Sequence, residues 1–373
     1  MAPTPLILQG MNSHKPSLVT VALAFLVFGA LALIVYAGGA VVAARSVLPS
    51  GLIPRERVLV VAPLGLWLLG LVYASLQEWA TVLQRLRDTT ATIDGTPALA
   101  SATSPPLIEL PKDALNFLAV FLGAVLTYWI SVDMAVGAVV ASALVGVCAA
   151  TLLKAHAVPA FAGSFVGMAS PELFGYSGIL LAGAIAGLAF VASKRVFNGY
   201  GGKLGTTAWA GCLGAALILG RPMLSATVPA WDLGWLLVLY SVGGAVLTFV
   251  LSVRFAQGPV MASALVGLAG GLILPSFHGP ALGGTLAVMV FCASFAGMSG
   301  TVRFRHARLM VPAGVMCALA FMYSAPFLGG AGGKLGTIAF GSVIGLHGLM
   351  GIAERLRQSI LAQTKPRTSV AGR

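Results

Sequence analysis

The chain has 373 residues, of which 58% are hydrophobic and only 9% are charged, and its mean hydropathy is +0.96. Soluble domains carry roughly a quarter charged residues, so this composition excludes a water-soluble protein. The net charge of +12 comes from Lys and Arg in segments that flank apolar runs. That distribution is typical of membrane proteins and argues against a nucleic acid partner.

Repeated apolar runs predict membrane-spanning helices. Most runs are about 17–25 residues long, which matches the hydrocarbon thickness of a bilayer at the rise of an α-helix. The sequence therefore predicts an all-α polytopic integral membrane protein with about 10–12 transmembrane helices. The predicted spans, in chain order, are 17–44, 58–81, 114–131, 134–153, 174–193, 205–220, 232–252, 258–275, 309–325 and 335–352.

The predicted spans fall into distinct regions. Residues 1–81 contain an N-terminal pair of transmembrane helices. The segment 82–113 is polar and rich in helix breakers, which predicts a cytoplasmic linker. Two membrane repeats follow at 114–222 and 231–353, and the chain ends in a basic cytoplasmic tail at 354–373, for which we expect no regular structure.

Four blocks of sequence occur twice in the same order, which predicts an internal duplication. The copies are 121 residues apart in the first two blocks and about 130 apart in the last two, so one insertion accounts for the shift. The blocks are GAVLT at 123–127 and 244–248, GAVVASALVG at 137–146 with GPVMASALVG at 258–267, FAGSFVGMAS at 161–170 with FCASFAGMSG at 291–300, and GGKLGT at 201–206 and 332–337.

Two short apolar stretches, 157–170 and 283–299, decide how the two copies are oriented. If they cross the membrane, each copy has five spans and the copies are inverted. If they are re-entrant, each copy has four spans and the copies are parallel. With the C-terminal tail in the cytoplasm, the inverted arrangement places 17 of the 22 Lys and Arg inside, and the parallel one places 14 there. Because basic residues concentrate in cytoplasmic loops, we favour an inverted 5+5 repeat after two N-terminal helices, with both termini cytoplasmic.

The repeated Ser-Phe-x-Gly-Met element is the candidate solute site. Inverted repeats are typical of secondary transporters, whose substrate sites lie near the midplane on short or interrupted helices. Broken helices expose backbone groups that need polar partners, and glycines allow a close backbone approach. Small residues also favour plain helix packing in membranes, so that alternative stays open. The predicted substrate-binding residues are Ser164, Phe165, Gly167, Met168, Ser294, Phe295, Gly297 and Met298.

The repeated GGKLGT block places a lysine just before an apolar helix. A helix start offers free N–H groups and a positive dipole end, and a lysine there adds attraction for anions. In the inverted arrangement the two lysines lie on opposite faces of the membrane. Alternatively, each lysine extends to lipid headgroups while the glycines form a tight turn. The predicted anion-attracting mouth comprises Gly201, Gly202, Lys203, Thr206, Gly332, Gly333, Lys334 and Thr337.

His156 and His278 lie shortly before the two Ser-Phe-x-Gly-Met elements and are candidates for a gate or proton relay, although histidines are also common at helix ends. None of the ten Asp and Glu recurs between the copies, which argues against a carboxylate-driven cation pump. The sequence contains no HExxH motif and no paired carboxylates. We therefore expect a protein that is not an enzyme and holds no cofactor or metal.

These features favour a permease or channel that moves a small anionic or neutral polar solute through a midplane site between the repeats. The alanine- and glycine-rich composition favours a bacterial cell inner membrane. A second hypothesis is a membrane scaffold or assembly subunit that transports nothing. A third is a lipid-handling enzyme or flippase, which the lack of an acid/base pair disfavours. The expected partners are the lipid bilayer, the solute, and either a second copy of the chain or subunits of a membrane complex.

Overall fold

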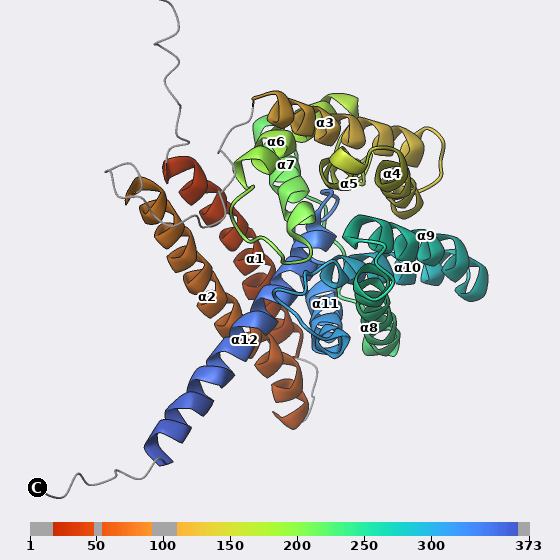
Figure 1. The fold of residues 1–373 in the computed structure, drawn as a ribbon. Coiled ribbons are helices and arrows are strands. Elements are labelled where there is room, and N and C mark those ends of the chain that lie inside the picture. Colours follow the sequence, from red (N-terminus) through yellow and green to blue (C-terminus); the bar gives the residue numbers. More distant parts are fainter. Residues whose placement is uncertain (1–17, 48–53, 92–109, 365–373) are drawn as a thin grey trace, which may run out of the picture.

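The computed structural model describes residues 18–47, 54–91 and 110–364 (Figure 1). Within these ranges the chain forms α-helices and two short 3-10 helices. The β-structure among the described residues is a single bridge between Leu224 and Gly329. The predicted all-α fold is therefore confirmed for the described part of the chain.

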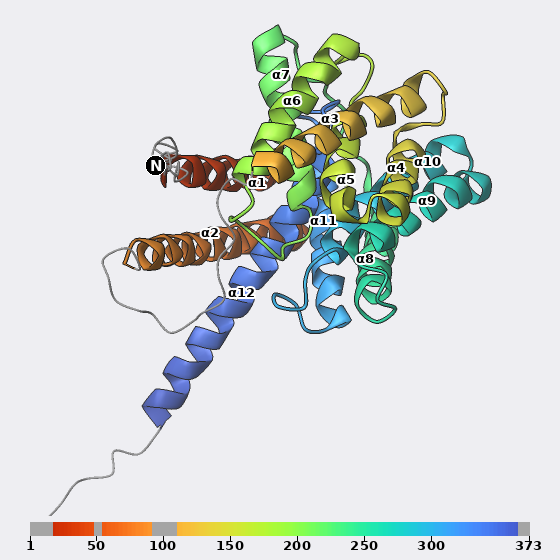
Figure 2. The same cartoon turned by 45° about the horizontal axis from the view of Figure 1, so that its top comes forward.

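The N-terminal helices pack against the last helix of the chain. Helices α1 (Leu18–Val47) and α2 (Pro54–Ala91) both contact α12 (Lys334–Thr364). At the crossing of α2 and α12 the backbones touch, because a Cβ added to Gly70 would lie 2.3 Å from the carbonyl oxygen of Gly345. Figures 1 and 2 show α1 and α2 on the side of the molecule away from α9 and α10, with α12 running from beside them toward the centre of the molecule.

The remaining helices form two sets of five. The first set is α3 (Leu110–Val132), α4 (Ala138–Leu152), α5 (Ala157–Val166), α6 (Tyr176–Ala192) and α7 (Lys203–Leu219). The second set is α8 (Trp231–Val253), α9 (Pro259–His278), α10 (Pro280–Gly297), α11 (Met310–Ser324) and α12. Each set contains one copy of the four repeated blocks. The sets meet where α4 packs against α9 and where α7 packs against α12.

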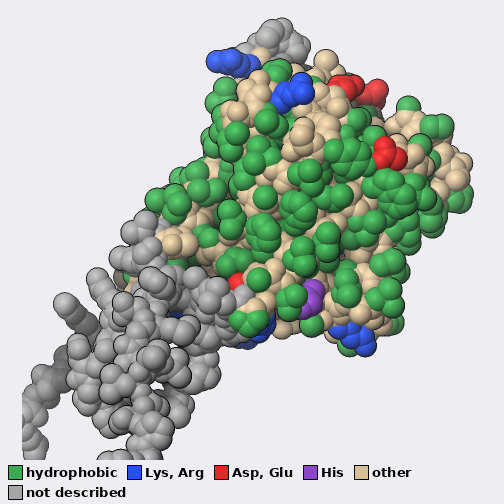
Figure 3. Space-filling view, turned by 90° about the horizontal axis from the view of Figure 1, so that it is seen from above, with side chains coloured by type: hydrophobic (Ala, Val, Ile, Leu, Met, Phe, Trp, Pro, Cys, Tyr) green, Lys and Arg blue, Asp and Glu red, His purple; other side chains and the backbone are tan. Residues whose placement is uncertain are grey.

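Eight of the described helices are long and apolar enough to cross a membrane. Three further apolar helices, α4, α6 and α7, are 15–17 residues long. Helix α5 has 10 residues and is about 15 Å long, which is half of the about 30 Å hydrocarbon core. Figure 3 shows hydrophobic side chains over most of one face, with charged side chains toward its upper and lower ends. These features identify the chain as an integral membrane protein.

The boundaries of two predicted polar regions differ from expectation. The tail was expected to lack regular structure from residue 354, but α12 continues to Thr364. The prediction is therefore wrong for residues 354–364. Charged and other helix-forming residues follow Glu354 without a glycine or proline, and the amide of Gln358 bonds to Glu354 one turn earlier at 2.9 Å. Helix α2 likewise runs into the predicted linker, of which 92–109 lies outside the described residues.

Loops of the two sets are linked reciprocally. The N–H of Ser170, which follows α5, donates to the carbonyl oxygen of Gly330, which precedes α12, at 2.8 Å. The N–H of Gly300, which follows α10, donates to the carbonyl oxygen of Gly199, which precedes α7, at 2.9 Å. The loop after the middle helix of each set, α5 or α10, is therefore fixed to the other set.

Candidate functional site

Four phenylalanines fill the junction between α5 and α10. Phe161 and Phe165 come from α5, Phe291 and Phe295 come from α10, and each is at most 1% exposed. The ring centroids of Phe165 and Phe295 are 4.5 Å apart, and those of Phe161 and Phe291 are 6.4 Å apart. We call these four residues the phenylalanine plug. The two Ser-Phe-x-Gly-Met elements therefore face each other, with aromatic side chains packed between them.

The serines of the elements are buried and hydrogen-bonded. Ser164 Oγ donates to the carbonyl oxygen of Phe161 at 2.8 Å, so it accepts from Ser142 Oγ, 2.8 Å away on α4. Ser294 makes the same two bonds in the second copy, at 2.7 Å to a backbone carbonyl and 2.8 Å to Ser263 Oγ on α9. The serines thus attach α5 and α10 to the helices that carry the ASALVG blocks, α4 and α9.

The glycines of the elements allow backbone contact. A Cβ on Gly167 or on Gly297 would lie 2.4 Å from a backbone carbonyl oxygen, on α3 in the first copy and on α8 in the second. The next residues, Met168 and Met298, are partly buried and line the two cavities described below. The glycines therefore set how closely the ends of α5 and α10 approach α3 and α8.

Each glycine of the first GGKLGT block has its own structural role. A Cβ on Gly201 would lie 2.2 Å from a carbonyl oxygen near the end of α10. Gly202 has φ = +80°, a backbone conformation that favours glycine, and it is the N-cap of α7. A Cβ on Gly205 would lie 2.4 Å from the Cα of Gly336 on α12. Gly201 and Gly205 thus permit close contacts with neighbouring helices, and Gly202 permits the turn that begins α7.

The second GGKLGT block meets the same constraints. Gly332 lies against the carbonyl end of α5, and Gly333 has φ = +89°. The threonines of both blocks, Thr206 and Thr337, are completely buried, and each bonds back to the carbonyl oxygen four residues earlier at 3.4 Å. The repeated glycines and threonines are therefore explained by packing in both copies.

Helices α7 and α12 cross in opposite directions at this motif. Gly202, at the start of α7, lies against the backbone of Phe340, well inside α12. Gly333, just before α12, lies against the backbone N–H of Trp209 in α7, and the Gly205–Gly336 contact lies between these two points. The two helices therefore overlap by their first turns and then diverge.

Each lysine of the motif connects two helices. Lys203 Nζ donates to the carbonyl oxygen of Ser193, the C-cap of α6, at 2.6 Å and to Asn198 Oδ1 at 2.8 Å. Lys334 Nζ donates to the carbonyl oxygen of Ser324, the last residue of α11, at 2.6 Å and to a second carbonyl in the following loop. A cation at the C-terminal end of a helix is stabilised by the helix dipole. Among the described residues, neither lysine forms a salt bridge with a carboxylate.

A cavity of about 440 Å³ contains Lys203. Asn198 and Tyr200 line it from the loop before α7, and Met298 lines it from the end of α10. Its second lysine, Lys194, forms an ion pair with Asp113. Asp and Glu do not occur among the residues that line this cavity.

A second cavity, of about 230 Å³, contains Lys334. Phe165 and Phe295 of the plug line it together with Met168 and Ser170. Its lining also lacks Asp and Glu. Each copy of the GGKLGT motif thus contributes a lysine to a cavity that also contacts the end of the other set's middle helix, α10 for Lys203 and α5 for Lys334. We call these spaces the Lys203 cavity and the Lys334 cavity.

The two histidines occupy helix ends beside neighbouring helices. His156 is the N-cap of α5, and its Nδ1 lies 3.1 Å from Asn116 Oδ1 on α3. His278 ends α9, and its Nε2 lies 2.7 Å from the hydroxyl of Tyr240 on α8. Neither histidine lines the Lys203 cavity or the Lys334 cavity.

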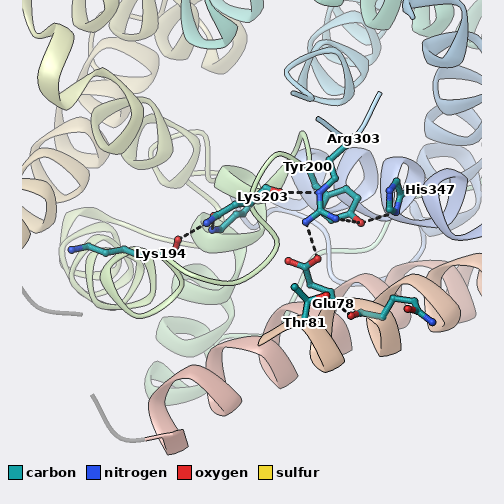
Figure 4. Close-up of polar contacts among 9 residues, drawn as sticks. Glu78, Thr81, Lys194, Tyr200, Lys203, Arg303 and His347 are labelled. Carbon is teal, nitrogen blue, oxygen red and sulfur yellow. Dashed lines mark hydrogen bonds and ion pairs between the residues drawn. The ribbon is translucent and has the colours of Figure 1, made fainter. Parts of the chain in front are cut away.

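A polar cluster that the sequence interpretation missed connects α2 to the Lys203 cavity. Arg303, in the loop after α10, donates from Nη2 to Glu78 Oε2 of α2 at 2.7 Å and from Nη1 to the hydroxyl of Tyr200 at 3.2 Å. Its Nε donates to the carbonyl oxygen of Asn198 at 3.1 Å. Figure 4 shows Arg303 between Glu78 and Tyr200, with His347 of α12 beyond the tyrosine.

The cluster is largely buried. The side chain of Glu78 is 4% exposed, and that of Arg303 is 19% exposed. Burial raises the pKa of Tyr200, so its hydroxyl stays protonated and can hydrogen-bond to Nδ1 of His347, 2.9 Å away. A glutamate within an otherwise apolar run was the signal that could have revealed this cluster, because such a residue needs a buried partner.

Comparison with protein-family models, curated proteins and solved structures gave no significant match.

Proposed function

We propose that the protein is a permease or channel of the cytoplasmic membrane for a small anionic or neutral polar solute. The observation that carries the proposal is the pair of cavities, each with a lysine and no carboxylate in its lining. Phe165 and Phe295 of the plug line the Lys334 cavity, and Met298, three residues after Phe295, lines the Lys203 cavity. The route would lead from one cavity past Phe165 and Phe295 to the other. In the described conformation the contact between these two rings closes it.

We also propose that the two sets of helices form an inverted 5+5 repeat, which would give this route two matched halves. Matched contacts recur between the two sets of helices, including the serine pairs, the lysine caps and the reciprocal loop bonds. The opposite directions of α7 and α12 at the Gly205–Gly336 contact are those expected of two inverted copies. In this arrangement α4, α6 and α7 cross the membrane together with the eight longer helices, and the segment that contains α5 makes the twelfth crossing. Both termini would lie in the cytoplasm of a bacterial cell.

The phenylalanine plug provides the functional test. Removing two rings from the closed junction should open the route, so F165A combined with F295A should raise solute flux into proteoliposomes about tenfold or more above wild type. Flux is measured with a panel of small anions and small neutral polar solutes. F174A is the control, because Phe174 is equally buried but lies outside the plug. If the plug variant moves no more solute than F174A, the route does not pass between α5 and α10.

The inverted arrangement predicts that two matched loops, after α5 and after α10, lie on opposite faces of the membrane. Glu172, after α5, and Val302, after α10, are both exposed, and Val302 is 94% exposed. In a C148A background, which removes the exposed native cysteine, E172C and V302C should react with a membrane-impermeant maleimide from opposite faces of the membrane. Labelling of inside-out and right-side-out vesicles measures this. Reaction of both residues from the same face would support the parallel arrangement instead.

A further inference from the structure

A large apolar groove lies between the first three helices of the first set. Its volume is about 780 Å³, and residues of α3, α4 and α5 line it. Apart from Trp129, Cys148 and His156, the lining consists of Leu, Val, Ala and Gly. It shares no lining residue with the Lys203 cavity or the Lys334 cavity. We call it the α3–α5 groove.

The second set places its own chain against the matching helix. The repeated blocks align Ala157, the first residue of α5, with Ala287 of α10. Helix α10 begins seven residues earlier, at Pro280, and so has about two additional turns. A Cβ on Gly283, in these turns, would lie 2.3 Å from the carbonyl oxygen of Leu274 on α9. The additional turns therefore pack against α9, whereas in the first set the groove borders α4.

A difference in one side chain widens the groove. Ala119 lines it and is aligned with Tyr240 of the second set, 121 positions later. Tyr240 is partly buried, and its hydroxyl lies 2.7 Å from Nε2 of His278. The first set thus lacks both the two helical turns and the aromatic ring of the second. The groove is the space that these groups fill in the other copy.

The groove opens to the lipid and has the dimensions of an acyl chain. The leucines of α3 that line it are about half exposed, for example Leu122 at 54%. Its lining on α3 extends from Leu115 to Trp129, about 21 Å at the rise of an α-helix. This exceeds the about 15 Å of hydrocarbon in one leaflet. Because the core of a bilayer contains no water, an acyl chain is the group that can occupy such a groove.

One end of the groove is basic. His156 lines it there, and Lys154, two positions earlier in the 3-10 helix Lys154–His156, is exposed. Lys112 is in the first turn of α3 at the same end. Asp113, a carboxylate at this end, forms an ion pair with Lys194. Basic residues at the membrane surface attract anionic lipid headgroups, so the charge at this end complements a phosphate.

We propose that the α3–α5 groove is a binding site for an anionic phospholipid of the bilayer, with one acyl chain along α3 and the phosphate at Lys154 and His156. The lipid takes the place that the first two turns of α10 take in the second set. This site goes beyond the proposed function and does not depend on it.

The test uses purified full-length protein in detergent. Dioleoylphosphatidylglycerol is the anionic probe, and dioleoylphosphatidylcholine is a zwitterionic probe with the same chains. Cys148 is the reporter, because it lines the groove and is exposed, whereas the other three cysteines are buried. Phosphatidylglycerol at ten times its Kd should slow alkylation of Cys148 by N-ethylmaleimide about tenfold. Phosphatidylcholine should need an about fivefold higher concentration for the same protection, the effect of one basic residue near an anionic headgroup.

Two variants test the two parts of the site. A119Y gives the first set the ring of the second and should make the alkylation rate independent of lipid. K154Q should raise the half-protecting concentration of phosphatidylglycerol about fivefold and leave that of phosphatidylcholine unchanged. Lys154 is exposed, so K154Q tests the site without altering the packing of the groove.

Two controls carry the same kinds of change elsewhere. A269Y adds a ring at the exposed position of α9 that is aligned with Cys148, and R305Q removes another exposed basic residue. Both should behave as wild type. Melting temperatures without lipid check that each variant is folded.

The contrary outcomes are distinct. Equal protection by the two lipids in wild type would overturn the headgroup site, and protection by neither would overturn the lipid site altogether. Protection that grows with protein concentration in the absence of lipid would assign the groove to contact between two copies of the chain instead. None of these measurements involves solute flux, so failure of the lipid site and failure of the permease are separate results.

Discussion

Replacing Gly205 by alanine should destabilise the fold by about 3 kcal/mol, the upper end of the range for overpacking. A Cβ at Gly205 would lie 2.4 Å from the Cα of Gly336, and a Cβ at Gly336 would lie 2.5 Å from the Cα of Gly205. Both contacts meet backbone, so no rotamer change can relieve them and the two helices must separate. The G205A/G336A double variant should fail to fold into the native arrangement. Thermal unfolding in detergent, followed by tryptophan fluorescence, measures the single variants.

Gly243 on α8 provides the matched control. A Cβ there would meet nothing within 4 Å, so the substitution tests helix propensity alone. Alanine favours a helix over glycine by up to about 1 kcal/mol, so G243A should be neutral or stabilising. Equal melting temperatures for G205A and G243A would contradict the close crossing of α7 and α12.

The second large effect concerns the buried ion pair between Glu78 and Arg303. E78Q should destabilise the protein by about 3 kcal/mol, the lower end of the range for breaking a buried pair, because it removes the carboxylate from the partly buried guanidinium of Arg303. The change should also loosen the loop before α7, since Arg303 bonds to Tyr200 and to the backbone of Asn198. The measurement is chemical or thermal unfolding in detergent.

A double-mutant cycle isolates the pair. R303Q should cost about as much as E78Q, whereas the E78Q/R303Q variant should be more stable than the sum of the two losses, because no uncompensated charge remains. The exposed pair Glu354–Arg357, at 3.8 Å, is the control, and E354Q should change stability by no more than about 0.5 kcal/mol. Additive losses at Glu78 and Arg303 would show that the two side chains do not act as a pair.

Much of the fold followed from local sequence. Each predicted span coincides with a helix within the described residues. The reason is that an uninterrupted apolar run in lipid can form all its backbone hydrogen bonds within itself only as a helix. Helix ends were less predictable. Helix α12 extends past its apolar part to Thr364, since charged residues can continue a helix into water when no glycine or proline stops it.

The repeated blocks identified the junction of α5 and α10 and the two lysines as candidate sites. They did not predict the contacts that these residues make. The sequence interpretation assigned Lys203 and Lys334 to an anion-attracting mouth. In the structure each also caps the end of the preceding helix. That role depends on the path of the loop between two helices, which hydrophobicity and charge counting do not specify. Binding of a solute by the Ser-Phe-x-Gly-Met elements stays a prediction.

The sequence by itself determined that this chain lies in a membrane, that it is helical, and that four blocks of its sequence occur twice. Apolar composition and repetition can be read from the sequence alone. Only the tertiary structure decided which side chains meet: Glu78 with Arg303, 225 positions apart, and Gly205 with Gly336 at the crossing of α7 and α12. The physical reason is that partners in a membrane protein are chosen by close packing and by the need to pair buried polar groups. Both depend on distances between helices that are remote in sequence.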